Sequence, residues 1–208
     1  MTLADRDLTE SGLAASGTGR VLIIGCGALA REILAILRQG NMDHVDLTCL
    51  PAILHNRPDC IGPALEATIA AHRADYETIF VAYADCGTGG ALADICAREG
   101  VDMIAGPHCY SFFEGNAAFA ERGEVTAFYL TDFLARQFDT FVTKPLGLDR
   151  HPELRDAYFG NYERLVYLAQ TDDPDLDTRA QTAATSLGLA YERRFTGYGV
   201  LATALAPL

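Results

Sequence analysis

The stretch Val21-Leu-Ile-Ile-Gly-Cys-Gly-Ala-Leu-Ala-Arg-Glu-Ile-Leu-Ala-Ile-Leu-Arg-Gln39 decides the fold. Its first four residues are apolar, and most of them are β-branched. Such a run is typical of a strand that is buried on both faces of a parallel sheet. Glycines follow at 25 and 27, and residues 28–39 then repeat apolar side chains with the period of a helix. The stretch therefore predicts a strand, a tight turn and a helix, which is how a βαβ unit begins.

The same pattern recurs along the chain. Apolar runs predict further strands at 45–50, 78–83, 101–105, 124–130, 164–169 and 189–195, with helical segments between them. This alternation indicates an α/β protein. We expect a single domain with one mostly parallel sheet and helices on both faces, a Rossmann-like arrangement whose strand order is left open. Residues 1–19 are small and polar, which predicts a disordered tail before a domain at 20–208.

Composition narrows the function classes. The 208 residues include 16 Lys and Arg against 28 Asp and Glu, a formal net charge of −12 with a pI near 4.7. This balance argues against nucleic acid and against an anionic membrane surface as partners. We find no signal peptide and no apolar run long enough to cross a membrane. Six cysteines are too few for a disulfide scaffold. We therefore expect a cytoplasmic protein with reduced thiols.

Cysteine or histidine follows each of the first four predicted strands. Parallel strands place the loops at their carboxyl ends on one edge of a sheet, where ligands bind in open α/β folds. The side chains expected to meet there are Cys26, His55, Cys86, His108 and Cys109. Thiolates with an added imidazole suit zinc, and a thiolate-rich site also suits an iron–sulfur cluster. We predict a metal site formed by Cys26, Cys86 and Cys109 with His55 or His108 as the fourth ligand, zinc being preferred to a cluster.

Two glycine-rich turns suggest an alternative, a metal-free module that binds a small anion or a partner protein. Gly25 and Gly27 fit a dinucleotide fingerprint. The strand at 45–50 lacks the acidic residue that would bind the ribose at its end, which disfavours NAD. A second turn precedes the helix at 91–99, where backbone N–H groups can hold a phosphate or carboxylate. Its candidate cofactor-binding residues are Gly87, Gly89 and Gly90.

A third reading is a thiol-dependent enzyme. Cys26 and Cys86 each precede a predicted helix, where backbone N–H groups lower a thiol pKa. No C-x-x-C motif supports a thioredoxin-like reaction. Cys49 and Cys96 fall within a predicted strand and helix and are interpreted as core residues, whereas Cys60 lies in a proline-flanked loop and is left unassigned.

The motifs taken together resemble the domain-of-unknown-function 1638 family. They are Ile24-Gly-Cys-Gly-Ala-Leu29, Leu50-Pro51 with Leu54-His-Asn-Arg-Pro58, Tyr83-Ala-Asp-Cys-Gly87 with Gly89, Gly106-Pro-His-Cys-Tyr110 with Gly115, and Phe128-Tyr-Leu-Thr131. The resemblance covers about residues 20–205. The resemblance implies an association with corrinoid-dependent methyltransferases as candidate partners. It further implies that the protein binds a small-molecule ligand and acts as an enzyme or accessory factor in one-carbon methyl transfer. Two departures are Ala84 in the third motif and Asp132-Phe133, where the family has a Gly-Trp-like element.

Overall fold

The computed structural model describes residues 3–208. Two compact units divide the chain: unit 1 combines residues 1–112 with 198–208, and unit 2 comprises residues 113–197. Each unit contains one sheet in which all paired strands are parallel. The predicted α/β class with parallel strands is confirmed, although the strands are divided between two sheets. The extent of a single domain over 20–208 stays a prediction.

The sheet of unit 1 has the order β2-β1-β3-β4. Its strands are β1 (Val21–Cys26), β2 (Val45–Leu50), β3 (Thr78–Ala82) and β4 (Asp102–Met103). In the register, Cys26 at the end of β1 lies beside Leu50 at the end of β2. Leu22, Ile23 and Ile24 have no exposed surface. The apolar run thus forms a strand that is covered on both sides, as its composition predicts.

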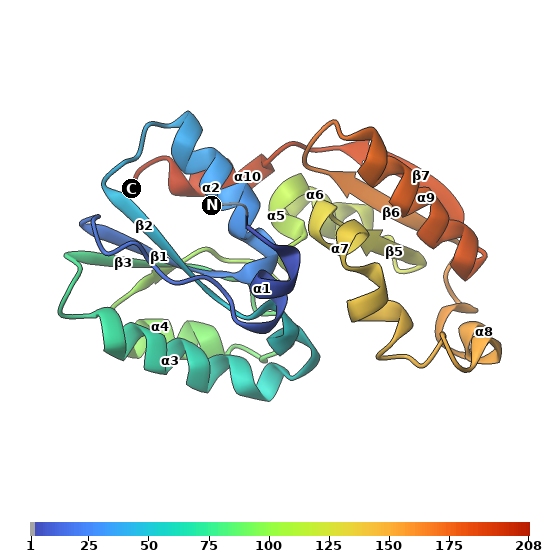
Figure 1. Cartoon of the computed structure of the whole chain (residues 1–208), viewed down its shortest axis with the longest axis horizontal. Helices are drawn as coiled ribbons and strands as arrows, with labels where there is room; N and C mark the ends of the chain where they lie inside the picture. Colours follow the sequence, from blue (N-terminus) through green and yellow to red (C-terminus); the bar gives the residue numbers. More distant parts are fainter. Residues whose placement is uncertain (1–2) are drawn as a thin grey trace. The chain divides into compact units, whose positions relative to one another are not determined.

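Helices cover both faces of this sheet (Figure 1). On one face lie α2 (Ala30–Gln39), entered through the 3-10 turn η1 (Gly27–Leu29), and α10 (Gly199–Leu205), which brings the C-terminal segment back beside α2. On the other face lie α3 (Ile61–His72) and α4 (Ala91–Glu99). The 3-10 turns η2 (Ala52–Asn56) and η3 (Pro58–Cys60) connect β2 to α3. Because the strands are parallel, the loops that follow them lie at one edge of the sheet, and the candidate site residues lie at that edge.

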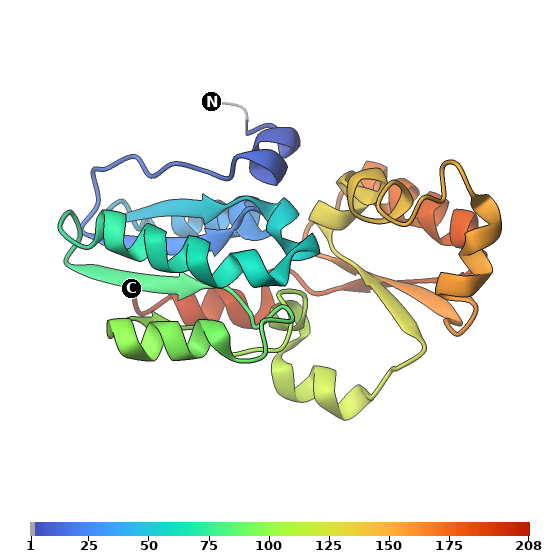
Figure 2. The same ribbon diagram turned by 90° about the horizontal axis from the view of Figure 1, so that it is seen from below.

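Unit 2 has the strand order β5-β6-β7, from β5 (Ala127–Leu130), β6 (Arg164–Ala169) and β7 (Ala190–Phe195). Its longest helix, α9 (Pro174–Leu187), packs against β6, β7 and α7 (Asp132–Arg136). Figure 2 shows α7 in yellow and α9 in orange-red on the same face of this sheet. Leu165, Tyr167 and the alanines of α9 form the apolar core. The remaining elements are α5 (Ser111–Glu114), which spans the unit boundary, α6 (Asn116–Arg122), the π-helical turn η4 (Asp139–Thr143), η5 (Pro152–Leu154) and α8 (Arg155–Phe159).

The N-terminal segment differs from the disordered tail expected from its composition. Residues 5–10 form the helix α1 (Asp5–Glu10), and the backbone of Leu13 exchanges hydrogen bonds with that of Cys49. Leu8 is only 1% exposed, and the guanidinium of Arg31 pairs with the carboxylate of Asp5 at 2.9 Å. One apolar side chain and these long-range contacts order the segment, a result that a local count of polar residues does not reveal.

Asp46 anchors the same segment to the sheet. Its buried carboxylate accepts hydrogen bonds from the backbone N–H of Thr18 at 2.9 Å and of Gly19 at 3.0 Å, from the Tyr76 hydroxyl at 2.8 Å, and from the Ser16 hydroxyl. Burial raises the pKa of Asp46, but these hydrogen bonds outweigh it and lower the pKa to about 2. The charged form of the carboxylate therefore stabilises the fold.

Asp46→Asn is expected to lower the free energy of unfolding at pH 7 by about 2 to 3 kcal/mol. Because the folded-state pKa lies below the unfolded value, this stability is complete above about pH 4 and is lost as the pH falls toward 2. Urea unfolding of both proteins at pH 7 and pH 3 measures the difference. A gap between wild type and variant that does not narrow at pH 3 would contradict the prediction.

No helix within residues 3–208 combines the length and the hydrophobicity needed to cross a lipid bilayer.

Candidate thiol site

Four connections at the carboxyl edge of the unit 1 sheet carry the candidate residues. Cys26 is the last residue of β1, and His55 lies in η2 after β2. Cys86 lies four residues after the end of β3, and Cys109 lies six residues after the end of β4. Cys26 and Cys86 are buried, Cys109 is partly buried and His55 is exposed. The side chains therefore run from the protein interior to its surface.

Backbone pairing brings two of these loops together. The N–H of Asp85 donates to the carbonyl of Gly106 at 2.9 Å, and the N–H of Cys86 donates to the carbonyl of Pro107 at 3.0 Å. These bonds continue the parallel pairing of β3 with β4 beyond the ends of the strands. As a result, the Sγ atoms of Cys86 and Cys109 are 3.4 Å apart.

Cys26 joins the same cluster from β1. Its thiol interacts with the thiol of Cys109 and with the hydroxyl of Tyr83. Tyr83 is 1% exposed, and its burial raises the pKa of the phenol. The phenol is therefore a neutral hydrogen-bond donor to a sulfur in a buried place. Cys109 thus lies between Cys26 and Cys86, and the three predicted cysteines form one contiguous group.

His55 is the histidine that contacts the cluster at Cys86. The hydrogen bond between its ring and the Cys86 sulfur raises the pKa of His55 and helps to lower that of Cys86. The ring of His108 stacks on that of Tyr110, with centroids 4.9 Å apart. The structure therefore places His55 in contact with a site cysteine, and the choice of His55 or His108 as a fourth ligand stays a prediction.

Hydrogen bonding distributes charge unevenly over the three thiols. The bond from Cys109 is the largest influence on Cys86 and, with the ring of His55, lowers the pKa of Cys86 to about 5 against the opposing effect of burial. The same kind of interaction lowers the pKa of Cys26. Cys109 serves both neighbours as donor, so its own pKa is raised. The site therefore favours the thiolate form of Cys86, which accepts the hydrogen bond from Cys109.

The backbone at Cys86 is unusual. Its φ is +48°, in the left-handed region that side chains other than glycine seldom adopt. Gly87, Gly89 and Gly90 follow with positive φ values and complete a tight turn into α4. Left-handed backbone at a non-glycine residue recurs at functional sites, where the surrounding structure holds it in place. Here the backbone bond from Cys86 to Pro107 fixes the turn.

Asp85 occupies the amides of this turn. Its carboxylate accepts hydrogen bonds from the N–H of Gly90 at 2.6 Å, from that of Gly89 at 3.3 Å and from the Thr88 hydroxyl at 2.9 Å. The bond from Gly90 is the main cause of the lowered pKa of Asp85. An external anion at Gly89 or Gly90 would have to displace this carboxylate. The anion-binding role of Gly87, Gly89 and Gly90 stays a prediction, and their present role is to shape the turn.

Gly25 and Gly27 have packing reasons for lacking a side chain. A Cβ on Gly27 would lie 2.2 Å from the carbonyl oxygen of Leu8 and 3.2 Å from the backbone nitrogen of Ala52. A Cβ on Gly25 would lie 3.0 Å from Cδ1 of Ile33. The N-terminal segment thus closes over the turn after β1. A cofactor-binding role of the two glycines stays a prediction.

The other three cysteines are not members of the thiol cluster. Cys49 and Cys96 are buried, and burial raises the pKa of both thiols, which confirms their interpretation as core residues. Cys60 is partly buried, with its Sγ 3.7 Å from the Asp59 carboxylate. Tyr83 is the site residue that the sequence analysis missed. The signal was its place at the start of the Tyr83–Gly87 motif, three residues before Cys86.

The thiols of the cluster interact with one another and are not arranged as ligands around an ion. Among residues 3–208, no three His, Cys, Asp or Glu side chains already surround a common point as metal ligands. Cys109 directs its interactions to its two neighbours, so the sulfurs contact one another. A metal ion would replace these thiol contacts, because ligation requires the thiolate form.

Comparison with known proteins identifies one family. Residues 49–205 match the model described as "Protein of unknown function (DUF1638)". The match includes His55, Tyr83, Cys86 and Cys109, whereas Cys26 precedes it. No curated protein and no solved structure is detectably similar to the chain. Because the matched residues make up most of its length, the chain belongs to this family of unknown function, DUF1638.

Proposed function

We propose that Cys26, Cys86, Cys109 and His55 form a metal-binding centre at the carboxyl edge of the unit 1 sheet, with zinc as the preferred ion. The observation that carries the proposal is the 3.4 Å separation of the Cys86 and Cys109 sulfurs, with Cys26 in contact with Cys109. Tetrahedral zinc–sulfur bonds of about 2.3 Å place two thiolates roughly 3.8 Å apart. The sulfurs of Cys86 and Cys109 therefore lie near the spacing of two ligands that share one ion.

The donor set also fits zinc chemically. Three thiolates and one imidazole are a common set of zinc ligands, and an added imidazole favours zinc over an iron–sulfur cluster. The lowered pKa of Cys86, about 5, matches the thiolate form that ligation needs, and the pKa of Cys26 is lowered in the same direction by its hydrogen bond with Cys109. His55 lies at the exposed edge of the group, so it is the ligand that an incoming molecule could displace. A bound zinc ion would then supply Lewis-acid chemistry at the open position.

The family resemblance supports a setting for this centre. The resemblance implies an association with corrinoid-dependent methyltransferases, so we propose that the centre belongs to an enzyme or accessory factor of one-carbon methyl transfer. A thiolate is both a metal ligand and the nucleophilic form of cysteine. Within the chain, Cys86 would hold the thiolate form, while Tyr83 would donate a hydrogen bond to the sulfur of Cys26.

Metal analysis of protein purified without added metal tests the proposal. Wild type is expected to contain about one equivalent of zinc, and Cys86→Ser and Cys109→Ser each less than about 0.2 equivalents, since each variant loses one of the three thiolates that hold the ion. Cys60→Ser is the matched control and keeps the wild-type content. Iron with sulfide in place of zinc would assign a cluster to the same ligands. Wild type with no transition metal, and no uptake on anaerobic reconstitution, would overturn the proposal.

The second candidate is a thiol-dependent enzyme with Cys86 as the nucleophile. The contact between Cys86 and the His55 ring favours it, because a cysteine and a histidine in hydrogen-bond contact form an activated nucleophile. Under this alternative, the wild-type protein is free of metal, and iodoacetamide labels Cys86 before Cys60. His55→Ala would slow that labelling and leave labelling of Cys60 unchanged.

A further inference from the structure

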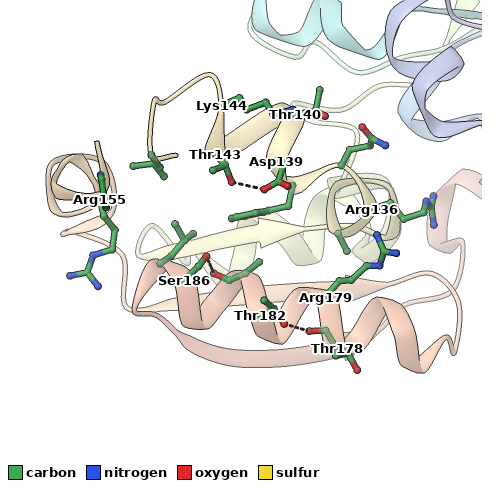
Figure 3. Close-up of a pocket in the computed structure, with 17 residues that line it drawn as sticks. Arg136, Asp139, Thr140, Thr143, Lys144, Arg155, Thr178, Arg179, Thr182 and Ser186 are labelled. Carbon is green, nitrogen blue, oxygen red and sulfur yellow. Dashed lines mark hydrogen bonds between the residues drawn. The ribbon is translucent and has the colours of Figure 1, made fainter. Parts of the chain in front are cut away.

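Unit 2 contains a cavity of about 890 Å³ that takes no part in the thiol site. It lies between the π-helical turn η4 and helix α9, and all of its lining residues fall within 135–187. Figure 3 shows Thr140, Thr143 and Lys144 on the wall formed by the turn, and Thr178, Thr182 and Ser186 on the facing wall formed by α9. Its volume is within the range of sites for small molecules.

The charge of this cavity is opposite to that of the protein. The lining includes four cationic side chains and one carboxylate, which are Arg136, Lys144, Arg155, Arg179 and Asp139. The whole chain carries a formal net charge of −12. A concave surface lined by one sign of charge concentrates ions of the opposite sign. The cavity is therefore a local site of attraction for anions on an otherwise acidic protein.

Two of these cations carry charge that the protein does not neutralise. Within residues 3–208, neither Lys144 nor Arg179 forms an ion pair or a side-chain hydrogen bond. Arg155 differs, because its guanidinium pairs with Asp156 and lies against Gly188 at the C-terminal end of α9. The carboxylate of Asp139 is partly occupied by the Thr143 hydroxyl at 3.0 Å. The balance of charge that faces the cavity is positive.

The positions of the cations indicate how an anion would lie. In Figure 3, Arg136 and Arg179 lie toward one end of the cavity and Arg155 toward the other, with Lys144 above the space between them. Apolar side chains of Phe138, Leu148 and Leu187 complete the lining. A ligand with negative charge at more than one point and an apolar portion between would match this arrangement.

The backbone of the lining supports a binding role independently. Asp139–Thr143 forms a π-helical turn, in which the N–H of Lys144 donates to the carbonyl of Asp139 at 2.9 Å. Such turns are rare and are frequently found at functional sites, because the wider turn displaces side chains from their helical positions. Three of the five residues in this turn line the cavity, namely Asp139, Thr140 and Thr143.

We propose that this cavity binds a multiply charged small organic anion, a phosphorylated or polycarboxylate molecule, with Lys144 and Arg179 as its principal contacts. Guanidinium groups bind phosphate and carboxylate through paired hydrogen bonds, and lysine contributes a point charge. The hydroxyls of Thr178 and Thr182 donate to carbonyls of their own helix, so the cations supply the main attraction.

Isothermal titration calorimetry with tripolyphosphate and with citrate tests the proposal on the full chain. Wild type is expected to bind at least one of them, with an affinity that falls as salt is raised. Binding of one probe in preference to the other identifies the headgroup. The double variant Lys144→Ala/Arg179→Ala is expected to weaken binding by at least tenfold, since two charge-assisted contacts are lost. Both side chains are exposed, so folding is expected to be preserved.

Two further variants locate the site. Thr182→Phe fills the cavity without changing charge and is expected to weaken binding. Arg150→Ala removes an exposed cation of unit 2 that does not line the cavity and is expected to have no effect. If wild type binds neither probe, or if Arg150→Ala weakens binding as much as the double variant does, the proposal is overturned. Unchanged affinity in Thr182→Phe would likewise place the anion elsewhere.

Discussion

Removal of the proposed metal ion is expected to lower the thermal unfolding midpoint of the wild-type protein by about 10 °C. A ligand that binds only the folded state stabilises it by about 4 kcal/mol when its free concentration is roughly a thousandfold above Kd. In a chain of this length, each kcal/mol corresponds to about 2 to 4 °C. The effect rests on the proposed centre, because an ion held by Cys26, Cys86 and Cys109 joins the end of β1 to the loops that follow β3 and β4. Differential scanning calorimetry before and after dialysis against a chelator measures it.

Two variants make this measurement specific to the thiol cluster. Cys109→Ser removes the central thiol of the group, so the chelator should no longer change its unfolding midpoint. Cys60→Ser, in a loop outside the cluster, should keep the full wild-type response. An equal response to the chelator in Cys109→Ser and wild type would show that the ion, if present, binds elsewhere. If the chelator does not change the unfolding midpoint of the wild-type protein, the proposed metal ion does not stabilise the fold.

The position of the thiol cluster could be predicted from the sequence because it depends on topology alone. The strand at 21–26 is marked by its apolar run, and every parallel strand ends at the same edge of the sheet. Cys26, Cys86 and Cys109 therefore had to lie near that edge, whatever the strand order. The structure adds that their sulfurs form one contiguous group, which no spacing in the sequence implies.

The remaining details of the site depend on contacts between loops, which leave no periodic signal. Whether His55 or His108 reaches Cys86 is decided by how η2 folds back after β2. The hydrogen bond between Tyr83 and Cys26 depends on two neighbouring strands of the sheet. In the same way, the amides of Gly89 and Gly90 look available in the sequence, but Asp85 occupies them through bonds formed only in the folded turn.

The division of the strands between two sheets has a similar explanation. Hydrophobic periodicity identifies the strands at 127–130 and 164–169, but it does not show which strands pair with each other. Pairing is set by the connections, and here β5 pairs with β6, whereas β4 pairs with β3 at the edge of the other sheet. The helical segment expected between the strands at 101–105 and 124–130 is divided into α5 and α6 at Gly115, whose φ is +89°. Each local element is specified by local sequence, whereas the arrangement of the sheets requires the tertiary contacts.

Asp132 illustrates how a departure from a family pattern can gain a structural role. It stands where the resemblance leads one to expect a Gly-Trp-like element, and its side chain is 1% exposed. Its carboxylate accepts hydrogen bonds from the Tyr167 hydroxyl at 2.7 Å, the N–H of Gln170 at 3.0 Å, and the N–H and hydroxyl of Thr171 at 3.0 and 2.6 Å. In return, the N–H of Asp132 donates to Oε1 of Gln170 at 2.7 Å. The carboxylate thus joins the start of α7 to the end of β6.

Asp132→Ala is expected to lower the free energy of unfolding of unit 2 by about 3 to 5 kcal/mol, because several buried donors lose their acceptor at once. Tyr167→Phe removes one of those bonds and should cost only about 1 kcal/mol. The matched control is Asp172→Ala, since Asp172 is 89% exposed and its ion pair with Arg193 is at the surface; a change within about 0.5 kcal/mol is expected. Hydrogen exchange of the Gln170 and Thr171 amides, combined with urea unfolding, measures these differences. Equal protection of the two amides in Asp132→Ala and wild type would show that the loop after β6 is held by other contacts.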